Sequence, residues 1–438
     1  MKNALKGLLA GLVVLVLCSP LMLWPADEAE VSGLQLSEVT VTIPSPVLVT
    51  ATLVPSESST TTTSEALAQA PPSTTTTTTT EPPISVTIAA VGDVLPHESI
   101  VRSVEDPGTG SYDFRPIFAP VAPYLVGADY AVANLETRLA GKQFGYSGYP
   151  VLNSPESLAY ALRSSGFDLV ATANNHCLDM GWQGVVNTLD VLDRYGLAHV
   201  GTYRSPEERK TPLVVNLQGI RVAFLNYATD LNGLALPEEQ QDYAVSLLAL
   251  DRVAQDAMLA RTWGADVVIA IVHWGTEYER EPNEAQRRVA GDMLSRGVDV
   301  ILGAHPHVVQ PIDHVFDFES WRVSDKYVAY SLGNFVSAQR WRYSDSGLIA
   351  FVHLEKQGLR TRVTGLSYLP VYVQRDTSGS VAKYRVLPVL PGLEPETDVV
   401  LTEADRSRMA QVWEELRAVL YRPDEDIVPL DPAQLGLR

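Results

Sequence analysis

Short apolar runs and amphipathic stretches alternate along the chain from residue 84 onward. The apolar runs are rich in β-branched residues and are mostly continuous, a pattern typical of strands that are covered on both faces. On this basis the sequence predicts strands at residues 84–92, 128–136, 167–175, 221–228, 265–273, 298–305 and 326–334.

Amphipathic stretches between several of these runs predict helices at residues 154–166, 181–196 and 283–297. In the first helix, Ser154 is the expected N-cap, Pro155 takes the first helical position, and Gly166 ends the helix. Because strands and helices alternate, we expect an α/β layered domain.

The predicted domain covers residues 84–375 and changes character towards its end. Strand-like segments at residues 347–355 and 361–373 follow each other without helices, so this end of the sheet is expected to be antiparallel. Residues 376–438 are interpreted as a C-terminal extension with one amphipathic helix, at residues 403–421.

Residues 1–26 contain an apolar stretch that follows Lys2 and Lys6, which predicts a secretory signal or an uncleaved membrane anchor. Acidic residues after the stretch favour an N-terminus inside the cell. We expect a single-pass anchor with the rest of the chain outside the cytoplasm, and a secreted protein is the alternative. Residues 27–83 are rich in Thr, Ser and Pro and predict a disordered stalk, because this composition buries too little to order the chain.

Composition narrows the classes of function. The chain has 438 residues, of which 46% are hydrophobic, and a formal net charge of −19. A charge of this sign argues against non-specific nucleic-acid binding, which needs clustered Lys and Arg. The chain has two cysteines. Cys18 lies in the N-terminal apolar stretch and Cys177 lies deep in the chain, so the sequence predicts no disulfide framework.

Polar residues gather where the predicted strands end, which is the edge at which open α/β sheets bind ligands. Five of the eight histidines are among them. The set comprises Asp93, His97, Asn134, Glu136, Asn174, Asn175, His176, His273, Glu277, His305, His307, Ser331 and Asn334. A hydrophobic core does not account for such a set, so we expect a site that is centred on metal ions.

The alternative interpretation assigns several of these residues to loop structure. Asp93 follows a glycine, as turn residues do, and Asn134 and Asn174 are suited to satisfying loop backbone. Ser331 and Asn334 are also candidates for fixing a loop, and Glu277 is a candidate for a solvated charge.

The mixture of carboxylate, carboxamide and imidazole groups indicates which ions the site would hold. It suits divalent Mn, Fe or Zn better than Ca or Mg, which prefer all-oxygen shells. A shared carboxylate can hold two ions side by side and activate water for attack. A histidine that is not bound to metal can then protonate the leaving group.

The motifs GDVLPH, NLE, NNH, HWGTEY, HPH and SLGNF, in this order, resemble the bacterial capsule-synthesis protein CapA family, which is tied to poly-γ-glutamate synthesis. The resemblance covers about residues 85–340. That family is similar to the calcineurin-like metallophosphoesterases, so the resemblance implies a two-sheet sandwich flanked by helices.

The resemblance also implies roles for individual residues. Metal ligands would be Asp93, His97, Glu136, Asn175, His273, His305 and His307, with Glu136 in the place of a bridging aspartate. Asp93 and His176 are the candidate catalytic residues, and His176 is the expected acid. Asn134, Asn174, Glu277, Ser331 and Asn334 would contact substrate or support the ligands.

Three positions depart from the metallophosphoesterase pattern. Leu95 stands where a histidine is expected, with His97 as its substitute, and Cys177 stands where an acidic residue is expected. Glu136 is the third departure.

Two hypotheses of function follow. The first is an extracytoplasmic metal-dependent hydrolase that acts on or helps export an anionic surface polymer such as poly-γ-glutamate, alongside capsule-synthesis subunits. The second is a surface accessory protein that keeps the fold without turnover.

Overall fold

The computed structural model describes residues 82–316, 325–392, 399–421 and 427–437. The predicted membrane segment, residues 1–26, and residues 27–81 of the predicted stalk lie outside these residues. Among the described residues, no helix combines the length and the apolar character that crossing a membrane requires.

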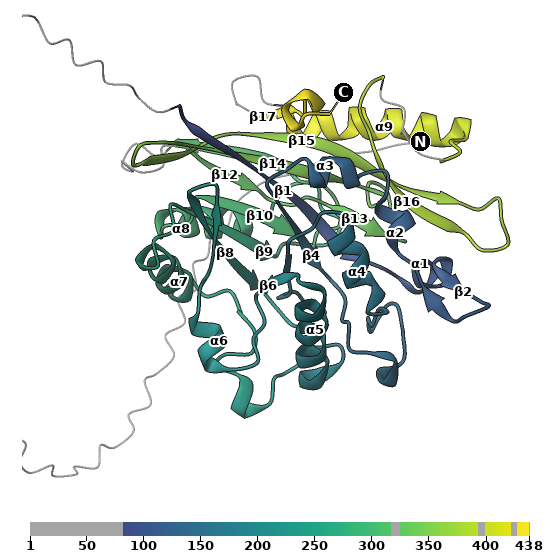
Figure 1. The fold of residues 1–438 in the computed structure, drawn as a ribbon, viewed down its shortest axis with the longest axis horizontal. Coiled ribbons are helices and arrows are strands. Elements are labelled where there is room, and N and C mark those ends of the chain that lie inside the picture. The colour runs from purple at the N-terminus through teal and green to yellow at the C-terminus, as the bar shows by residue number, and fades with distance from the viewer. Residues whose placement is uncertain (1–81, 317–324, 393–398, 422–426, 438) are drawn as a thin grey trace, which may run out of the picture. The chain divides into compact units, whose positions relative to one another are not determined.

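Two β-sheets form the centre of the described domain (Figure 1). The nine-stranded sheet contains, in spatial order, β16 (Lys383–Pro388), β15 (Arg360–Asp376), β14 (Ser346–Gln357), β1 (Ile84–Leu95), β4 (Tyr130–Leu135), β5 (Leu169–Ala171) and β6 (Ala198–Val200), with β13 (Asn334–Ser337) beside β1 and β17 (Ile427–Pro429) beside β15. The six-stranded sheet contains β11 (Ile312–Phe316), β12 (Asp325–Ala329), β10 (Val300–Ala304), β9 (Val267–His273), β8 (Ile220–Ala228) and β7 (Leu213–Leu217). A separate short hairpin consists of β2 (Glu105–Asp106) and β3 (Ser111–Tyr112).

Nine α-helices accompany the two sheets in the described residues. They are α1 (Glu98–Ser103), α2 (Arg115–Phe118), α3 (Ala122–Val126), α4 (Ser157–Ser164), α5 (Gly181–Tyr195), α6 (Pro206–Lys210), α7 (Leu250–Thr262), α8 (Glu284–Ser295) and α9 (Glu403–Leu420). Helices α1 to α5 pack on the nine-stranded sheet, and α7 and α8 pack on the six-stranded sheet. The predicted α/β layering is therefore confirmed.

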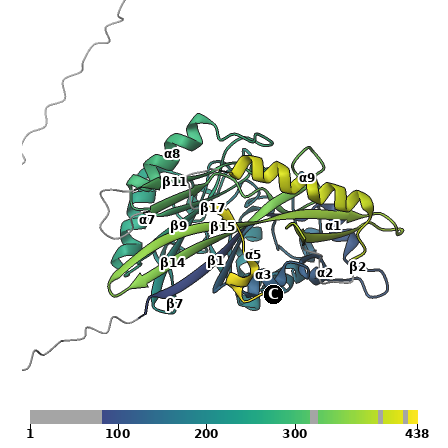
Figure 2. The same ribbon diagram turned by 90° about the horizontal axis from the view of Figure 1, so that it is seen from above.

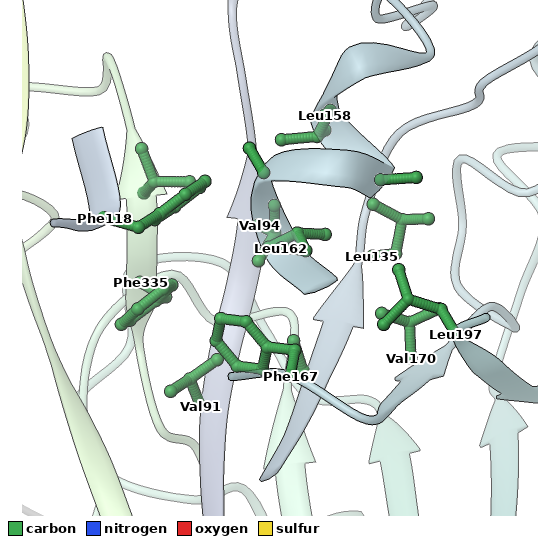
Figure 3. Packing of buried hydrophobic residues seen from close by; sticks show 14 of the residues in the cluster. Val91, Val94, Phe118, Leu135, Leu158, Leu162, Phe167, Val170, Leu197 and Phe335 are labelled. Carbon is green, nitrogen blue, oxygen red and sulfur yellow. The ribbon is translucent and has the colours of Figure 1, made fainter. Parts of the chain in front are cut away.

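Strand β1 shows why the apolar runs are continuous. Val86, Ile88 and Ala90 point into the core between the two sheets, whereas Ala89 and Val91 point into the core beneath the helices. Successive side chains of a strand face opposite sides, so a strand with two buried faces needs apolar residues at every position. Figure 3 shows the helix-covered core, in which Val91 and Val94 of β1 belong to one cluster with Leu162 of α4 and Phe167.

The end of the nine-stranded sheet is antiparallel, as predicted, because β14 pairs antiparallel with both β1 and β15. Strand β16 adds to β15 on the other side. Helix α9 lies along β15 in Figures 1 and 2, and its buried residues Met409, Val412, Leu416 and Leu420 join the core between the sheets.

Two local predictions were wrong. Helix α4 has Glu156 at its N-cap, so Ser154 does not cap it; instead the Ser154 hydroxyl contacts that of Thr137, 3.0 Å away. The apolar run at residues 326–334 is not one strand, because β12 ends at Ala329 in one sheet and β13 begins at Asn334 in the other. The run looks continuous in sequence because both halves are buried.

Candidate metal centre

The carboxyl ends of parallel strands from both sheets meet at one edge. Strands β1 and β4 run parallel in the nine-stranded sheet, and β9 and β10 run parallel in the six-stranded sheet. Asp93 lies near the end of β1 and Glu136 follows β4, whereas His273 ends β9 and His305 follows β10. The fold therefore delivers acidic groups from one sheet and imidazoles from the other.

Unusual backbone shapes the turn that follows β10. His305 and His307 have φ angles of 99° and 58°, in the left-handed region that non-glycine residues seldom adopt. At Gly303, an added Cβ would lie 1.8 Å from the carbonyl oxygen of Tyr330, so only glycine lets the two segments approach. Strained backbone of this kind is concentrated at functional sites.

Five side chains form two groups with the spacing that a metal ion requires. One group is Asp93, Glu136 and His307, and the other is Glu136, His273 and His305. The Nδ1 atom of His307 lies 3.0 Å from Asp93 Oδ2 and 3.9 Å from Glu136 Oε2. On the other side, His273 Nε2 lies 3.5 Å from Glu136 Oε1. Glu136 therefore stands between the groups, one oxygen towards each.

Asn175 faces the second group through its amide oxygen. Its Oδ1 lies 3.0 Å from His273 Nε2, while its Nδ2 donates a hydrogen bond to Asn232 Oδ1 at 3.2 Å. This second bond orients the amide, because it leaves the oxygen as the atom turned towards the histidines. Sequence analysis did not single out Asn232, which lies in a loop outside the motifs.

Asn134 and Asn174 support the ligand residues from behind. Asn134 Nδ2 donates to Asp93 Oδ1 at 2.8 Å and lies 3.3 Å from His273 Nδ1. Asn174 donates to the carbonyl oxygen of Leu135 at 2.8 Å. Polar partners behind metal ligands fix the ligand geometry and so tune the site.

The chemistry of the donors fits divalent ions. Glu136 is 0% exposed and neither carboxylate oxygen has a hydrogen-bond partner, an arrangement that costs several kcal/mol for a charged group without a cation. Burial, and after it the charge of Asp93, raises the pKa of the Glu136 carboxyl. Burial lowers the pKa of His273 and of His305, which keeps both imidazoles in the neutral form that binds metal.

His176 is held by a carboxylate that sequence analysis missed. Its Nδ1 lies 2.8 Å from Asp179 Oδ2, which also accepts a hydrogen bond from the Leu152 amide at 2.6 Å. The available signal was an acidic residue three positions after a histidine in the motif NNHCLD. Thus Asp179 supplies an acidic partner although Cys177 occupies the position where one was expected.

A cavity of about 410 Å³ opens beside these residues. His176 and His307 both face it, which places a candidate acid and a candidate metal ligand against the same space. Its other lining residues are Leu95, His97, Tyr149, Glu277, Tyr278, Gln339 and Trp341. Glu277, predicted to contact substrate, therefore lies in the cavity wall and in neither ligand group.

Of the predicted ligands, the structure leaves His97 apart. Among the described residues it belongs to neither ligand group, and its Nδ1 lies 3.1 Å from the carbonyl oxygen of Leu95. Burial lowers the pKa of His97 to about 4, against the effect of that hydrogen bond. Ser331 accepts a bond from the Gly333 amide, and Asn334 donates to Gln339 and Ser344, so both hold loops around the cavity.

Known proteins are similar to this chain over the region that carries the site residues. Residues 87–339 match the family model described as "Bacterial capsule synthesis protein PGA_cap". "Capsule biosynthesis protein CapA" of Bacillus anthracis is 30% identical over 281 residues, which cover 62% of this chain and 65% of that protein, slightly under two thirds. "PGA biosynthesis protein CapA" of Bacillus subtilis is 30% identical over 298 residues, covering 67% of this chain and 73% of that protein. The calcineurin-like phosphoesterase YfkN from Bacillus subtilis overlaps 77% of this chain and 99% of the solved structure, at 13% identity and a TM-score of 0.38.

Proposed function

Since the chain belongs to the bacterial capsule synthesis protein PGA_cap family, we propose that it is a metal-dependent hydrolase of surface-polymer synthesis. It acts on an anionic polymer or its precursor during synthesis, processing or export. Poly-γ-glutamate is the candidate polymer, which the resemblance to the capsule-synthesis family suggests; the Bacillus subtilis relative is named for PGA biosynthesis and the Bacillus anthracis relative for capsule biosynthesis. Its partners are the other subunits of the capsule-synthesis complex.

The position of Glu136 carries the proposal. Among the described residues, this carboxylate is fully buried, its oxygens accept no hydrogen bond, and it is shared by the two groups of candidate ligands. A purely structural carboxylate would be paired with a cation or hydrogen-bonded, because burying it otherwise destabilises the fold. Two divalent ions, Mn, Fe or Zn, account for both oxygens at once.

Residues around these ions have different roles in the proposed reaction. When bound, such ions activate water and polarise the oxygens of the substrate. Asp179 holds His176 through Nδ1, so Nε2 is the nitrogen left to carry a proton into the cavity and to the leaving group. Asn134 holds Asp93 in position, and Asn232 orients the Asn175 oxygen.

The place of action in this proposal is outside the cytoplasm. The apolar segment within residues 1–26 anchors the chain in the cell membrane, and the Thr-rich residues 27–83 separate the domain from it. Secretion after cleavage of that segment is the alternative. Protease treatment of intact cells tests this, because a domain inside the cytoplasm would survive the treatment uncut.

The experiment that tests the hydrolase measures metal and turnover in the full-length chain. Protein expressed in medium with Mn, Fe and Zn is analysed by mass spectrometry and assayed on a generic phosphodiester and on γ-glutamyl peptides. We expect close to two ions per chain and cleavage of one substrate class. A chain that holds no ion overturns the proposal, and cleavage confined to the phosphodiester identifies a more general surface phosphoesterase.

One observation favours a second candidate function, that of a non-catalytic accessory protein. Leu95 stands where the metallophosphoesterase pattern has a histidine. Among the described residues, His97 belongs to neither ligand group and so does not replace that histidine. In the producing cell, His176→Ala separates the two functions. An accessory protein keeps polymer output in His176→Ala and loses it in Asp93→Ala, whereas a hydrolase loses it in both.

A further inference from the structure

Residues 338–345 connect β13 to β14 and border the cavity beside the candidate metal centre. Gln339 and Trp341 line the cavity, and Trp341 leaves 66% of its surface exposed. The two arginines in this segment, Arg340 and Arg342, flank Trp341 in sequence and are themselves exposed. The segment that borders the cavity therefore carries two exposed cationic side chains that belong to none of the sequence motifs.

Aromatic rings contact three guanidinium groups on and beside this segment, and a fourth arginine lies across the strand pair from one of the rings. Arg280 and Arg342 lie over the ring of Tyr343, at 4.0 and 4.6 Å from its centroid. Arg340 lies 5.7 Å from the centroid of the Tyr384 ring. Tyr384 is the cross-strand partner of Arg375, whose side chain therefore projects from the same face of the sheet. We name Arg280, Arg340, Arg342 and Arg375 the arginine rim.

Ion pairs within the described residues do not cancel the charge of the arginine rim. Within the described part of the chain, none of its four arginines forms an ion pair, although the net charge of the protein is −19. The charge of Asp345 acts on Arg340, but the Asp345 carboxylate is bound by Arg408 in a bidentate pair at 2.8 and 2.9 Å. Arg280 Nη2 donates a hydrogen bond to the carbonyl oxygen of Glu415 at 2.7 Å. This bond fixes the side chain without cancelling its charge.

We propose that the arginine rim is an anion-binding subsite for an extended polymer, of which one unit enters the cavity at the metal centre. A guanidinium is a planar donor that matches carboxylates and phosphates in a two-point contact. Stacking on aromatic rings holds the donors in place before the ligand arrives, which reduces the entropy that binding costs. This inference rests on the proposed function for the identity of the polymer class.

The cavity itself restricts what the polymer can be. No Lys or Arg is among its lining residues, and Glu277 in its wall repels a negative charge. Tyr149, Tyr278 and Trp341 instead offer apolar surface, since Tyr149 is 75% exposed. The fitting ligand therefore has one anionic group per short repeating unit, separated by short uncharged segments. Both γ-linked glutamate and glycerol phosphate have this chemistry.

The test compares arginine substitutions in and away from the rim, in the full-length, metal-loaded chain. Arg340→Gln/Arg342→Gln removes two rim charges. The matched control is Arg194→Gln/Arg360→Gln, two exposed arginines without ion pairs, of which Arg360 pairs with Gln357 at the opposite end of the sheet. Calorimetry measures the dissociation constants of short γ-glutamate oligomers, glycerol-phosphate oligomers and inorganic phosphate.

We expect the rim variant to bind the preferred oligomer at least about tenfold more weakly, because a charge-assisted hydrogen bond contributes this much or more. The control should match the parent chain, and inorganic phosphate should bind all three proteins equally. The oligomer that binds more tightly identifies the anionic group. Equal oligomer affinity in all three proteins, or no oligomer binding beyond that of inorganic phosphate, overturns the subsite.

Metal content and turnover are measured on the same samples, which keeps two failures apart. Binding that depends on the rim but occurs without cleavage overturns the hydrolase and keeps the subsite. Cleavage by a rim variant with unchanged affinity overturns the subsite and keeps the hydrolase. Metal content should be equal in all three proteins, since no rim residue is in a ligand group.

Discussion

Replacing Glu136 by glutamine should change the stability of the protein in opposite directions with and without metal. The substitution keeps the shape of the side chain and removes the charge. Without metal, the carboxylate is fully buried and its oxygens have no hydrogen-bond partner. Burial and the charge of Asp93 raise the pKa of this carboxyl, so keeping it ionised costs free energy that a neutral amide does not, and Glu136→Gln should leave the metal-free protein as stable as before, or stabilise it.

With metal bound, Glu136→Gln should instead make the protein less stable than the parent chain. Both ligand groups contain Glu136, so the variant loses a ligand from each ion at once. Ligand binding stabilises a folded protein by about 4 kcal/mol when the free ion is at 1,000 times its dissociation constant. The parent chain should therefore gain roughly 5–10 °C in melting temperature on addition of the ion, and Glu136→Gln should gain almost none.

The assay is a melting curve with and without each ion, beside metal content by mass spectrometry. Glu277→Gln is the matched control, because Glu277 lines the neighbouring cavity but is in neither ligand group. It should keep the metal-induced shift, and so should His176→Ala, which loses only turnover. Full metal retention in Glu136→Gln would refute the two-ion assignment and leave at best a single ion on the histidines.

Three further predictions test the supporting residues. Asn232→Leu should lower the affinity for one ion by about tenfold while Asn232→Asp retains it, because the acceptor that orients Asn175 is kept; equilibrium dialysis measures this. Asp179→Asn should keep its metal and melting temperature but lower kcat by about 10²-fold or more, because the amide lacks the negative charge that keeps Nδ1 protonated and stabilises the charged imidazole; normal kcat would contradict the role. Burial lowers the pKa of His353, so the unfolded chain takes up the proton first and stability falls as pH drops below about 6.5. His353→Gln should remove up to about 1 kcal/mol of that loss at about pH 5.5 in urea unfolding, and an unchanged pH profile would refute it.

Much of the fold can be read from the order of apolar runs. Strands β1, β8 and β9 are visible in the sequence because each is buried on both faces, and helices α5 and α8 because each has one apolar side. The sequence analysis did not predict short edge strands such as β6 and β7, because a strand of few residues with one exposed face leaves a weak pattern. The division of residues 326–334 between two sheets also escaped, because burial looks the same in either sheet.

The sequence by itself determined which chemical groups stand at the strand ends, because parallel strands present their carboxyl ends at one edge. Asp93, Glu136, His273, His305 and His307 are therefore recognisable as candidate ligands from the sequence. Only the tertiary structure decided how they are shared, with Glu136 between two groups and His97 in neither. Distances across two sheets depend on how the sheets pack, and a single chain pattern does not encode them. The same holds for Asp179, Asn232 and the arginine rim, whose partners come from remote segments of the chain.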